Sequence, residues 1–228
     1  MDKEKERPSL RAAALQMVST PRVADNLATA ERLLELAVDS GARLAVLPEY
    51  FAIISADARE KVRLRERFGA GPIQDWLARQ AARLGLWIVG GTVPLEADVP
   101  DKVRNACLVH APDGRCVARY DKIHMFDVDL ANGESYRESR SYRPGELAVL
   151  HDLPWGRLGL TICYDLRFPS LFRALAEAGA SFLAIPSAFT KQTGEAHWHV
   201  LNRARAIENG CYVLAAAQGG THENGRET

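Results

Sequence analysis

Three side chains that could do chemistry together stand at or near the ends of predicted strands. Glu49 follows the apolar segment LAVLP, Lys122 ends CVARYDK, and Cys163 ends GRLGLTIC. In layered α/β proteins, ligands bind beyond the carboxyl ends of strands, where loops and helix N-termini converge. If the three strands are neighbours, a carboxylate, an ammonium and a thiol meet over one pocket.

Such a trio supports acyl transfer from an amide or a related carbon–nitrogen bond through a thioester. A carboxylate can take the thiol proton and later give it to the leaving amine, and a thiol near pH 7 needs such help to act as a nucleophile. A cation beside the carbonyl stabilises the oxyanion of the tetrahedral intermediate. Each residue also has an ordinary alternative, since Cys163 could be a core residue, Glu49 a helix-capping group and Lys122 a surface charge.

Other catalytic arrangements find less support in the sequence. Six histidines are available, but none stands in a cysteine–histidine protease signature. His197 and His199 are two residues apart on a predicted helix and point in different directions, which argues against a shared metal site. The patterns GxSxG, GxxxxGK(S/T) and GxGxxG are absent, and Gly90-Gly91 is too short a signal for phosphate binding. The sequence therefore predicts an enzyme without a metal or cofactor.

Apolar runs predict the strands and helices that must position these residues. We expect strands over 10–18, 43–47, 86–93, 104–110, 116–122, 156–163, 181–188 and 211–218. We expect helices over 24–41, 57–68, 71–85, 169–178 and 194–210. Residues 112–115 predict a hairpin turn, because Gly114 tolerates a positive φ, and the polar segment 133–145 predicts a long surface loop. Buried strands that alternate with amphipathic helices indicate an α/β fold.

Composition limits the classes of function. The chain has 228 residues, and its 29 Lys plus Arg balance its 29 Asp plus Glu, so the formal charge is zero. A balanced chain lacks the basic excess that binds nucleic acid or an anionic membrane surface. No repeat or charged linker divides the sequence, so we expect a single domain over 1–228 with a core over 9–218.

The N-terminus and the cysteines predict a cytoplasmic location. The segment MDKEKERPSL carries charges of both signs and has no apolar run, so we expect no signal peptide. No stretch approaches the roughly 20 apolar residues that cross a bilayer. The four cysteines form no CxxC pair and have no zinc-type spacing, so we expect reduced thiols.

The segments around the three reactive residues resemble the nitrilase, or carbon–nitrogen hydrolase, superfamily. These segments are LPEYF around Glu49, RYDKIHMFDVD around Lys122 and TICYDLRFP around Cys163. RESRSYRPGE, IPSAF and TGEAHWHVLNRARAIEN also look like that family, so the resemblance runs from Leu10 to the end of the chain. Three motifs in the right order and at wide spacing are far more specific than any one of them alone.

The resemblance implies a four-layer α-β-β-α sandwich that carries a Glu–Lys–Cys triad. Cys163 would be the nucleophile, Glu49 the general base and acid, and Lys122 the oxyanion stabiliser. The backbone N–H of Tyr164 would be the second oxyanion donor. Glu138 matches a second glutamate that family members place beside the triad to position substrate and base.

Arg167 is a candidate for substrate binding. It lies four residues past the nucleophile candidate, and a guanidinium there could hold a substrate carboxylate through a bidentate pair. The alternative is that Arg167 pairs with Asp165 or Glu177 and never meets substrate.

Within the superfamily, the chain resembles the branch that contains ω-amidase and deaminated-glutathione amidase. By analogy we expect a homodimer, with 169–178 and 204–209 as candidate contacts. Family members continue past the AAAQ strand with further strands, so we expect C-terminal strands to be missing from this chain and its sheet edge to be left incomplete.

The sequence thus predicts a cysteine-dependent hydrolase of small linear amides, which releases ammonia through a thioester acyl-enzyme. The expected substrates are carboxylate-bearing amides, namely deaminated glutathione or ω-amides of 2-oxo acids. Three alternatives stay open: a catalytically silent binding or assembly protein with a shortened nitrilase fold, a thiol-based redox or acyl-carrying protein, and a nitrile hydrolase.

Overall fold

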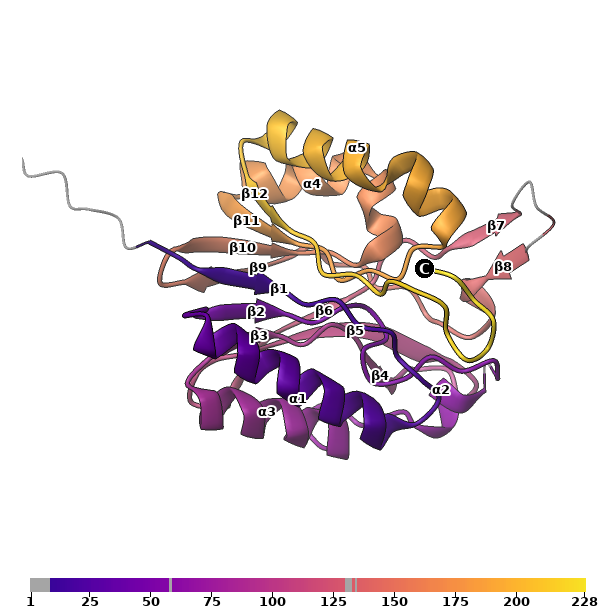
Figure 1. The fold of residues 1–228 in the computed structure, drawn as a ribbon. Coiled ribbons are helices and arrows are strands. Elements are labelled where there is room, and N and C mark those ends of the chain that lie inside the picture. The colour runs from indigo at the N-terminus through magenta and orange to yellow at the C-terminus, as the bar shows by residue number, and fades with distance from the viewer. Residues whose placement is uncertain (1–8, 58, 130–132, 134) are drawn as a thin grey trace, which may run out of the picture.

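Two β-sheets stack face to face, and a pair of helices covers the outer face of each (Figure 1). This computed structural model describes residues 9–57, 59–129, 133 and 135–228. The first eight residues, on which the expectation of no signal peptide depends, lie outside the described part of the chain. The layer order is the predicted α-β-β-α sandwich, so the predicted fold class is confirmed.

The first sheet carries Glu49 and Lys122 just beyond two of its strands. Its strand order is β1-β2-β3-β5-β4, and β6 pairs with β5. β1, β2 and β3 run parallel, whereas β5 is antiparallel to β3, β4 and β6. The strand bounds are Ala12–Ala14 for β1, Leu44–Val46 for β2, Trp87–Val89 for β3, Val93–Glu96 for β4, Val103–His110 for β5 and Cys116–Asp121 for β6.

The second sheet carries Cys163 beyond one of its strands. Its order is β12-β11-β10-β9, in which β10, β11 and β12 are parallel and β9 is antiparallel to β10. The bounds are Val149–Leu153 for β9, Gly156–Leu160 for β10, Ala180–Ala184 for β11 and Tyr212–Leu214 for β12. A separate short hairpin joins β7, Asp127–Asp129, to β8, Ser135–Arg137.

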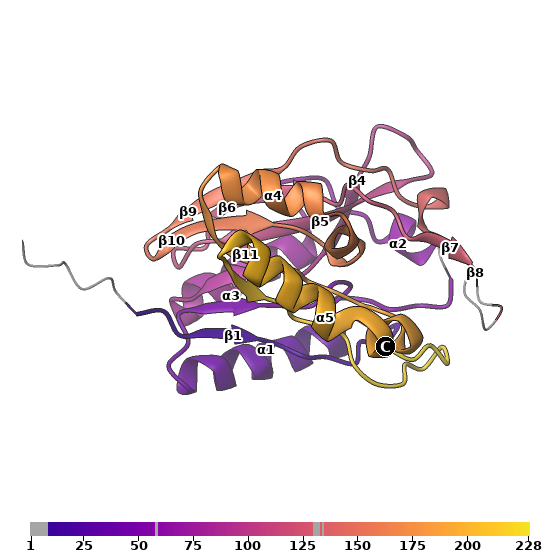
Figure 2. The ribbon, with the colours of Figure 1, turned by 90° about the horizontal axis from the view of Figure 1, so that it is seen from above.

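Two helix pairs close the outer faces of the sheets. α1, Val23–Asp39, and α3, Pro72–Leu84, cover the first sheet, while α4, Pro169–Glu177, and α5, Lys191–Asn209, cover the second (Figure 2). α3 begins with Pro72 in its first turn and ends at Gly85, whose φ of +58° is favourable for glycine. None of the helices in the described ranges is long and apolar enough to span a membrane.

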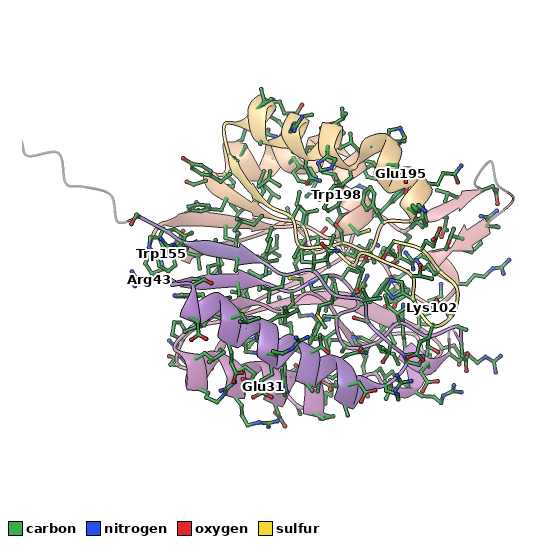
Figure 3. All side chains as sticks on the ribbon, in the orientation of Figure 1. Glu31, Arg43, Lys102, Trp155, Glu195 and Trp198 are labelled. Carbon is green, nitrogen blue, oxygen red and sulfur yellow. The ribbon has the colours of Figure 1, made fainter. Side chains whose placement is uncertain are left out.

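The core lies in three layers between these elements. A cluster of buried side chains from both sheets fills the space between them and continues beneath α4, and a second cluster packs α1 and α3 onto the first sheet. Away from the candidate site, the Arg43 guanidinium lies 4.9 Å from the ring centre of Trp155 and links the two sheets (Figure 3). This packing leaves the ends of β2, β6 and β10 held rigidly with respect to one another.

Several predicted boundaries are wrong, and the helix over 57–68 is the clearest case. Only α2, Glu60–Arg63, is helical there, and residue 58 lies outside the described residues. The chain leaves the helix because Glu66 joins the first sheet: its N–H donates to Pro94 O at 2.9 Å, and Glu96 N–H donates to Glu66 O at 2.9 Å. The pattern of charged residues in this segment does not reveal a pairing with residues 94 and 96, far along the chain.

Two other corrections bear on the site. The strand predicted over 86–93 is two strands, β3 and β4, separated at Gly90-Gly91. The strand predicted to end at Cys163 ends at Leu160, and Cys163 opens a 3-10 helix, η2, Cys163–Arg167. The loop predicted over 133–145 contains β8 and a second 3-10 helix, η1, Glu138–Arg140, while β9 was not anticipated and residue 134 lies outside the described residues. The predicted hairpin turn is confirmed, since β5 and β6 pair across it and Gly114 has a φ of +86°.

Candidate active site

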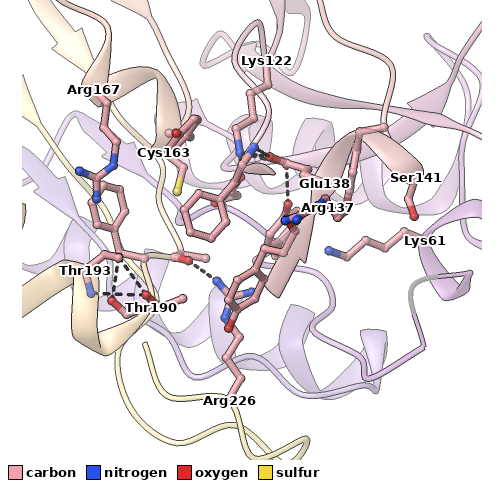
Figure 4. A pocket seen from close by; sticks show the side chains of 18 residues that line it. Lys61, Lys122, Arg137, Glu138, Ser141, Cys163, Arg167, Thr190, Thr193 and Arg226 are labelled. Atoms are coloured by element: carbon pink, nitrogen blue, oxygen red, sulfur yellow. Dashed lines mark hydrogen bonds and ion pairs between the residues drawn. The ribbon is translucent and has the colours of Figure 1, made fainter. Parts of the chain in front are cut away.

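One cavity of about 200 Å³ brings together residues that are far apart in the sequence (Figure 4). It lies where the carboxyl ends of strands from the two sheets meet the β7–β8 hairpin and the start of α5. Every site residue predicted from the sequence lines this cavity: Glu49, Lys122, Glu138, Cys163, Tyr164 and Arg167.

The backbone around Glu49 is held by several contacts. Glu49 O accepts a hydrogen bond from Gln218 Nε2 at 3.1 Å, and Tyr50 N–H donates to Thr92 Oγ1 at 2.9 Å. Tyr50 has a φ of +58°, which is costly for a residue with a side chain. Gly91 lets the neighbouring chain pass close to this turn, because a Cβ on it would lie 2.2 Å from Pro48 O. These contacts hold the turn in its strained conformation beside the buried Glu49 side chain.

Cys163 stands at a similar strained turn. Its N–H donates to Pro186 O at 2.9 Å, which extends the pairing with the neighbouring strand, and its φ of +49° then turns the chain into η2. Asp165 stabilises the turn, since its carboxylate accepts a hydrogen bond from Ile162 N–H at 2.9 Å. A non-glycine residue in the left-handed region at a cavity wall is typical of a functional position.

Asp165 is the centre of a buried network behind the cysteine. Its carboxylate also accepts from the Tyr120 hydroxyl at 2.7 Å and lies 2.6 Å from His124 Nδ1. The His124 ring stacks on Phe168 with 3.6 Å between the ring centres. Both carboxylate oxygens of Asp165 are occupied by these contacts. Asp165 therefore supports the Cys163 turn and does not pair with Arg167.

Lys122 is buried between two carboxylates. Its ammonium lies 2.9 Å from Glu49 Oε1 and 2.9 Å from both carboxylate oxygens of Glu138. Burial alone would lower the pKa of Lys122, but the charges of Glu138 and Glu49 outweigh burial and hold that pKa well above its usual value. Lys122 is therefore positively charged at neutral pH.

Glu138 is held as firmly as Lys122. One of its oxygens accepts from the Tyr50 hydroxyl at 2.9 Å, and the other accepts from Phe126 N–H at 2.7 Å. Glu49 is also held by Asn105, whose Nδ2 donates at 2.8 Å to Glu49 Oε1, the same oxygen that Lys122 contacts. The two carboxylates and the ammonium thus form one hydrogen-bonded network with little freedom to move.

The Cys163 thiol is neutral at rest. Burial raises its pKa well above the usual value, the nearby Glu49 carboxylate raises it further, and the Lys122 ammonium only partly opposes this. A thiol in this state needs a base to remove its proton before it can attack a carbon atom. The nearby carboxylate that could do so is Glu49.

Tyr164 and Arg167 lie on the side of the cavity beyond Cys163. The Tyr164 ring packs edge-on against Phe126 and Phe168, with ring centres 5.1 and 5.4 Å away. The Arg167 guanidinium lies 5.5 Å from the ring centre of Phe189, and its Nη1 is 3.2 Å from His197 Nδ1. Arg167 therefore does not pair with Asp165 or Glu177.

Sequence reasoning missed four residues of this site. Asn105 could have been found from the sequence, because a polar residue inside the apolar run RNACLVH needs a buried hydrogen-bond partner. Tyr50 adjoins Glu49 but gives no sign of its contact with Glu138. Lys61 and Arg226 also line the cavity, and both come from segments whose positions depend on long-range packing.

Nothing in the described ranges supplies a metal centre. No group of three or more histidine, cysteine, aspartate or glutamate side chains is placed there to hold a metal ion. His197 faces Arg167, and His199 lines a different cavity.

The sequence of the chain matches a family model described as carbon-nitrogen hydrolase over residues 11–228. A deaminated glutathione amidase from Yersinia enterocolitica is 46% identical over 218 residues, which cover 95% of this chain and 76% of that protein. A human protein of the same name is 42% identical and is covered over 66% of its length, against 94% of this chain.

Solved structures agree with the sequence matches. The NitFhit protein of Caenorhabditis elegans has a TM-score of 0.83 at 35% identity, covering 95% of this chain and 52% of that chain. Nit3 of Saccharomyces cerevisiae, described as a member of branch 10 of the nitrilase superfamily, has a TM-score of 0.82 at 29% identity, covering 92% of this chain and 76% of that chain.

Proposed function

The chain belongs to the carbon–nitrogen hydrolase family, and we propose that it is an amidase whose nucleophile is Cys163, with Glu49 as general base and acid and Lys122 as oxyanion stabiliser. The observation that carries this proposal is the cavity itself. It places a neutral thiol beside a buried carboxylate, and it holds that carboxylate against a lysine that is positively charged at neutral pH.

In the first half of the reaction, the Cys163 sulfur attacks the amide carbon while Glu49 takes the thiol proton. The carbonyl oxygen becomes an oxyanion, which the Lys122 ammonium and the backbone N–H of Tyr164 stabilise. The carbon–nitrogen bond then breaks, and Glu49 returns its proton to the leaving nitrogen. The products are an amine, or ammonia from a primary amide, and a thioester on Cys163.

In the second half, water attacks the thioester carbon and Glu49 takes a proton from it. The carbon–sulfur bond breaks, the thiolate recovers a proton from Glu49, and the acid leaves. Glu49 thus moves one proton in each direction in each half-reaction. The firm hydrogen bonds from Asn105 and Lys122 keep its carboxylate in place throughout.

We propose carboxylate-bearing linear amides as substrates, with deaminated glutathione and ω-amides of 2-oxo acids as the candidates to test first. The names of the relatives support this choice, as does the number of cationic side chains on the cavity wall: Lys61, Arg137, Arg167 and Arg226 besides Lys122. The test is a turnover screen of the purified protein over carboxylated amides, neutral monoamides and nitriles. Release of no more than one equivalent of ammonia or amine per subunit would instead favour the silent or acyl-carrying alternatives.

Glu138 is proposed as a positioning residue, and Glu138→Gln tests that role. We expect kcat to fall about tenfold or more with a smaller change in KM, because Lys122 loses one of its two ionic partners and a hydrogen bond between charged groups contributes about 1.5–3 kcal/mol. Steady-state kinetics and the melting temperature measure the two effects separately. Wild-type kinetics in this variant would show that Glu138 is only a structural neighbour.

Arg167 is proposed to bind a substrate carboxylate, and Arg167→Met tests this. We expect a loss of about 1.5–3 kcal/mol in kcat/KM for carboxylated amides and a much smaller loss for neutral ones. The Arg167 contact with His197 involves a ring nitrogen and no negative charge, so the guanidinium has no ionic partner there that a substrate carboxylate would have to displace. Equal losses on both kinds of amide would mean that Arg167 supports the wall of the cavity and does not select the substrate.

We further propose that the protein works as a homodimer in the cytoplasm. Large apolar side chains are exposed on α5 and β12, among them Ile207 at 81% and Tyr212 at 73%, and Ile207 lies in one of the predicted contact segments. All four cysteines are free thiols, which suits a reducing compartment.

A further inference from the structure

The Lys61 ammonium is a cation on the cavity wall that no acidic side chain neutralises. It lies 3.4 Å from the ring centre of Tyr50 and 5.4 Å from that of Tyr142. Within the described part of the chain, it forms no hydrogen bond or ion pair. Figure 4 shows Lys61 reaching into the cavity toward Glu138, on the opposite side of Cys163 from Arg167.

The surroundings of Lys61 are unfavourable for its charge in the absence of a bound anion. Burial and the charge of Arg226 lower the pKa of Lys61 to about 7, although the carboxylates of Glu49 and Glu138 partly oppose this. Those two carboxylates already make their ionic contacts with Lys122. An ammonium that lies in a cavity against aromatic rings, without an anionic partner, is typical of a ligand-binding position.

Arg226 adds a second cation to the same part of the wall. Its Nη2 donates to Ala188 O, and its guanidinium lies 5.8 Å from the ring centre of Tyr136. Its Nε is buried and has no hydrogen-bond partner among the described residues. Two positively charged groups on one wall, each with unused donors, match an anionic group of a ligand.

We propose that Lys61, with Arg226 beside it, binds an anionic group of the substrate on the side of the scissile bond away from Arg167. This proposal rests on the proposed amidase function. In an amide that carries a carboxylate on each side of the scissile bond, Arg167 would bind one and Lys61 the other, with the amide carbon held between them at Cys163. Lys61 is then a specificity-determining residue that acts by direct contact with the substrate.

N-succinylglycine and its two monomethyl esters provide the test, because the parent compound has a carboxylate on each side of one amide bond. We expect Lys61→Met to lower kcat/KM for N-succinylglycine at least about tenfold, mainly through KM. In wild type, each ester should react less well than the parent. In Lys61→Met, the ester that lacks the Lys61-bound carboxylate should react as well as the parent, so its penalty disappears, while the penalty of the other ester should persist. Arg167→Met should show the reverse. If both penalties persist in Lys61→Met, the proposal is wrong.

Two further variants separate loss of charge from loss of structure. Lys61→Arg keeps the charge and should retain most of the selectivity, while Met removes the charge above the Tyr50 ring and keeps an unbranched apolar side chain. Arg63→Met, on the exposed side of the same helix and paired with Asp57 and Glu60, should leave all three substrates unaffected. Equal losses on the parent and both esters in Lys61→Met would show a structural role and overturn the proposal.

The pH dependence gives an independent readout. Because charged Lys61 is the binding form, kcat/KM for N-succinylglycine should be high below pH 7 and fall above it, relative to kcat/KM for the ester that lacks the Lys61-bound carboxylate. The groups that face Lys61 are Tyr50, Tyr142, Glu49, Glu138, Lys122 and Arg226. Burial raises the pKa of both tyrosines well above the usual value, so they do not titrate in this range. Lys61→Arg should abolish the fall, and a fall that persists would contradict the assignment.

Binding without turnover distinguishes failure of this proposal from failure of the amidase function. Calorimetry with glutarate on Cys163→Ala should detect binding that weakens at least about tenfold when Lys61→Met is added. If wild type hydrolyses no amide but glutarate binding still depends on Lys61, only the amidase function fails. Glutarate binding that is indifferent to Lys61 overturns the anion site.

Discussion

Cys163→Ser is expected to lower kcat at least about a thousandfold while leaving the protein folded. The serine hydroxyl fits the same strained turn, so the melting temperature should change little. Its proton is much harder to remove than that of the thiol, and Glu49 is a weak base for this purpose. Turnover of the best amide in the screen, together with a thermal melt, measures both properties.

Cys116→Ser is the matched control for this substitution. Cys116 is exposed on β6 and lies outside the cavity, so this variant should keep full activity. Substantial turnover by Cys163→Ser, or loss of turnover by Cys116→Ser, would contradict the assignment of the nucleophile.

Glu49→Gln is expected to lower both acylation and deacylation by about a hundredfold to ten-thousandfold, the usual contribution of a general base. The amide oxygen of glutamine can still accept a hydrogen bond from Lys122 or Asn105, so the cavity should persist. It cannot take the Cys163 proton, and burial keeps the thiol pKa high. Rapid-quench measurement of the first turnover separates acylation from the steady state.

The control for this change is Glu146→Gln, at an exposed position outside the cavity, which should be silent. Normal acylation in Glu49→Gln followed by a stalled thioester would mean that another group removes the thiol proton. Glu49 would then serve only as the base for water.

The parts of the fold that depend on local pattern could be predicted from the sequence. Apolar runs identified β2, β5, β6, β11 and the helices α1, α3, α4 and α5, because each buries one continuous face. The segment 57–68 could not be read in this way, since the pairing of Glu66 with the first sheet depends on Pro94 and Glu96. The break at Gly90-Gly91 has a tertiary cause too, the close approach of the chain beside Glu49.

The candidate site shows the same division. Glu49, Lys122 and Cys163 follow recognisable strands, and short motifs mark each of them. Lys61 lies in a charged segment with no such motif, and its place on the cavity wall follows from the packing of Tyr50 and Tyr142. Contacts between residues far apart in the sequence therefore determine which charged side chains line the cavity and which remain at the surface.

Mass spectrometry of the protein and of its peptides, quenched during turnover of a carboxylated amide, tests whether Cys163 is the nucleophile. We expect a mass increase equal to the acyl group on Cys163 and on none of Cys107, Cys116 and Cys211, and the increase should vanish in Cys163→Ala. Steady amide hydrolysis with unmodified Cys163, or an acyl group on another cysteine, would contradict it.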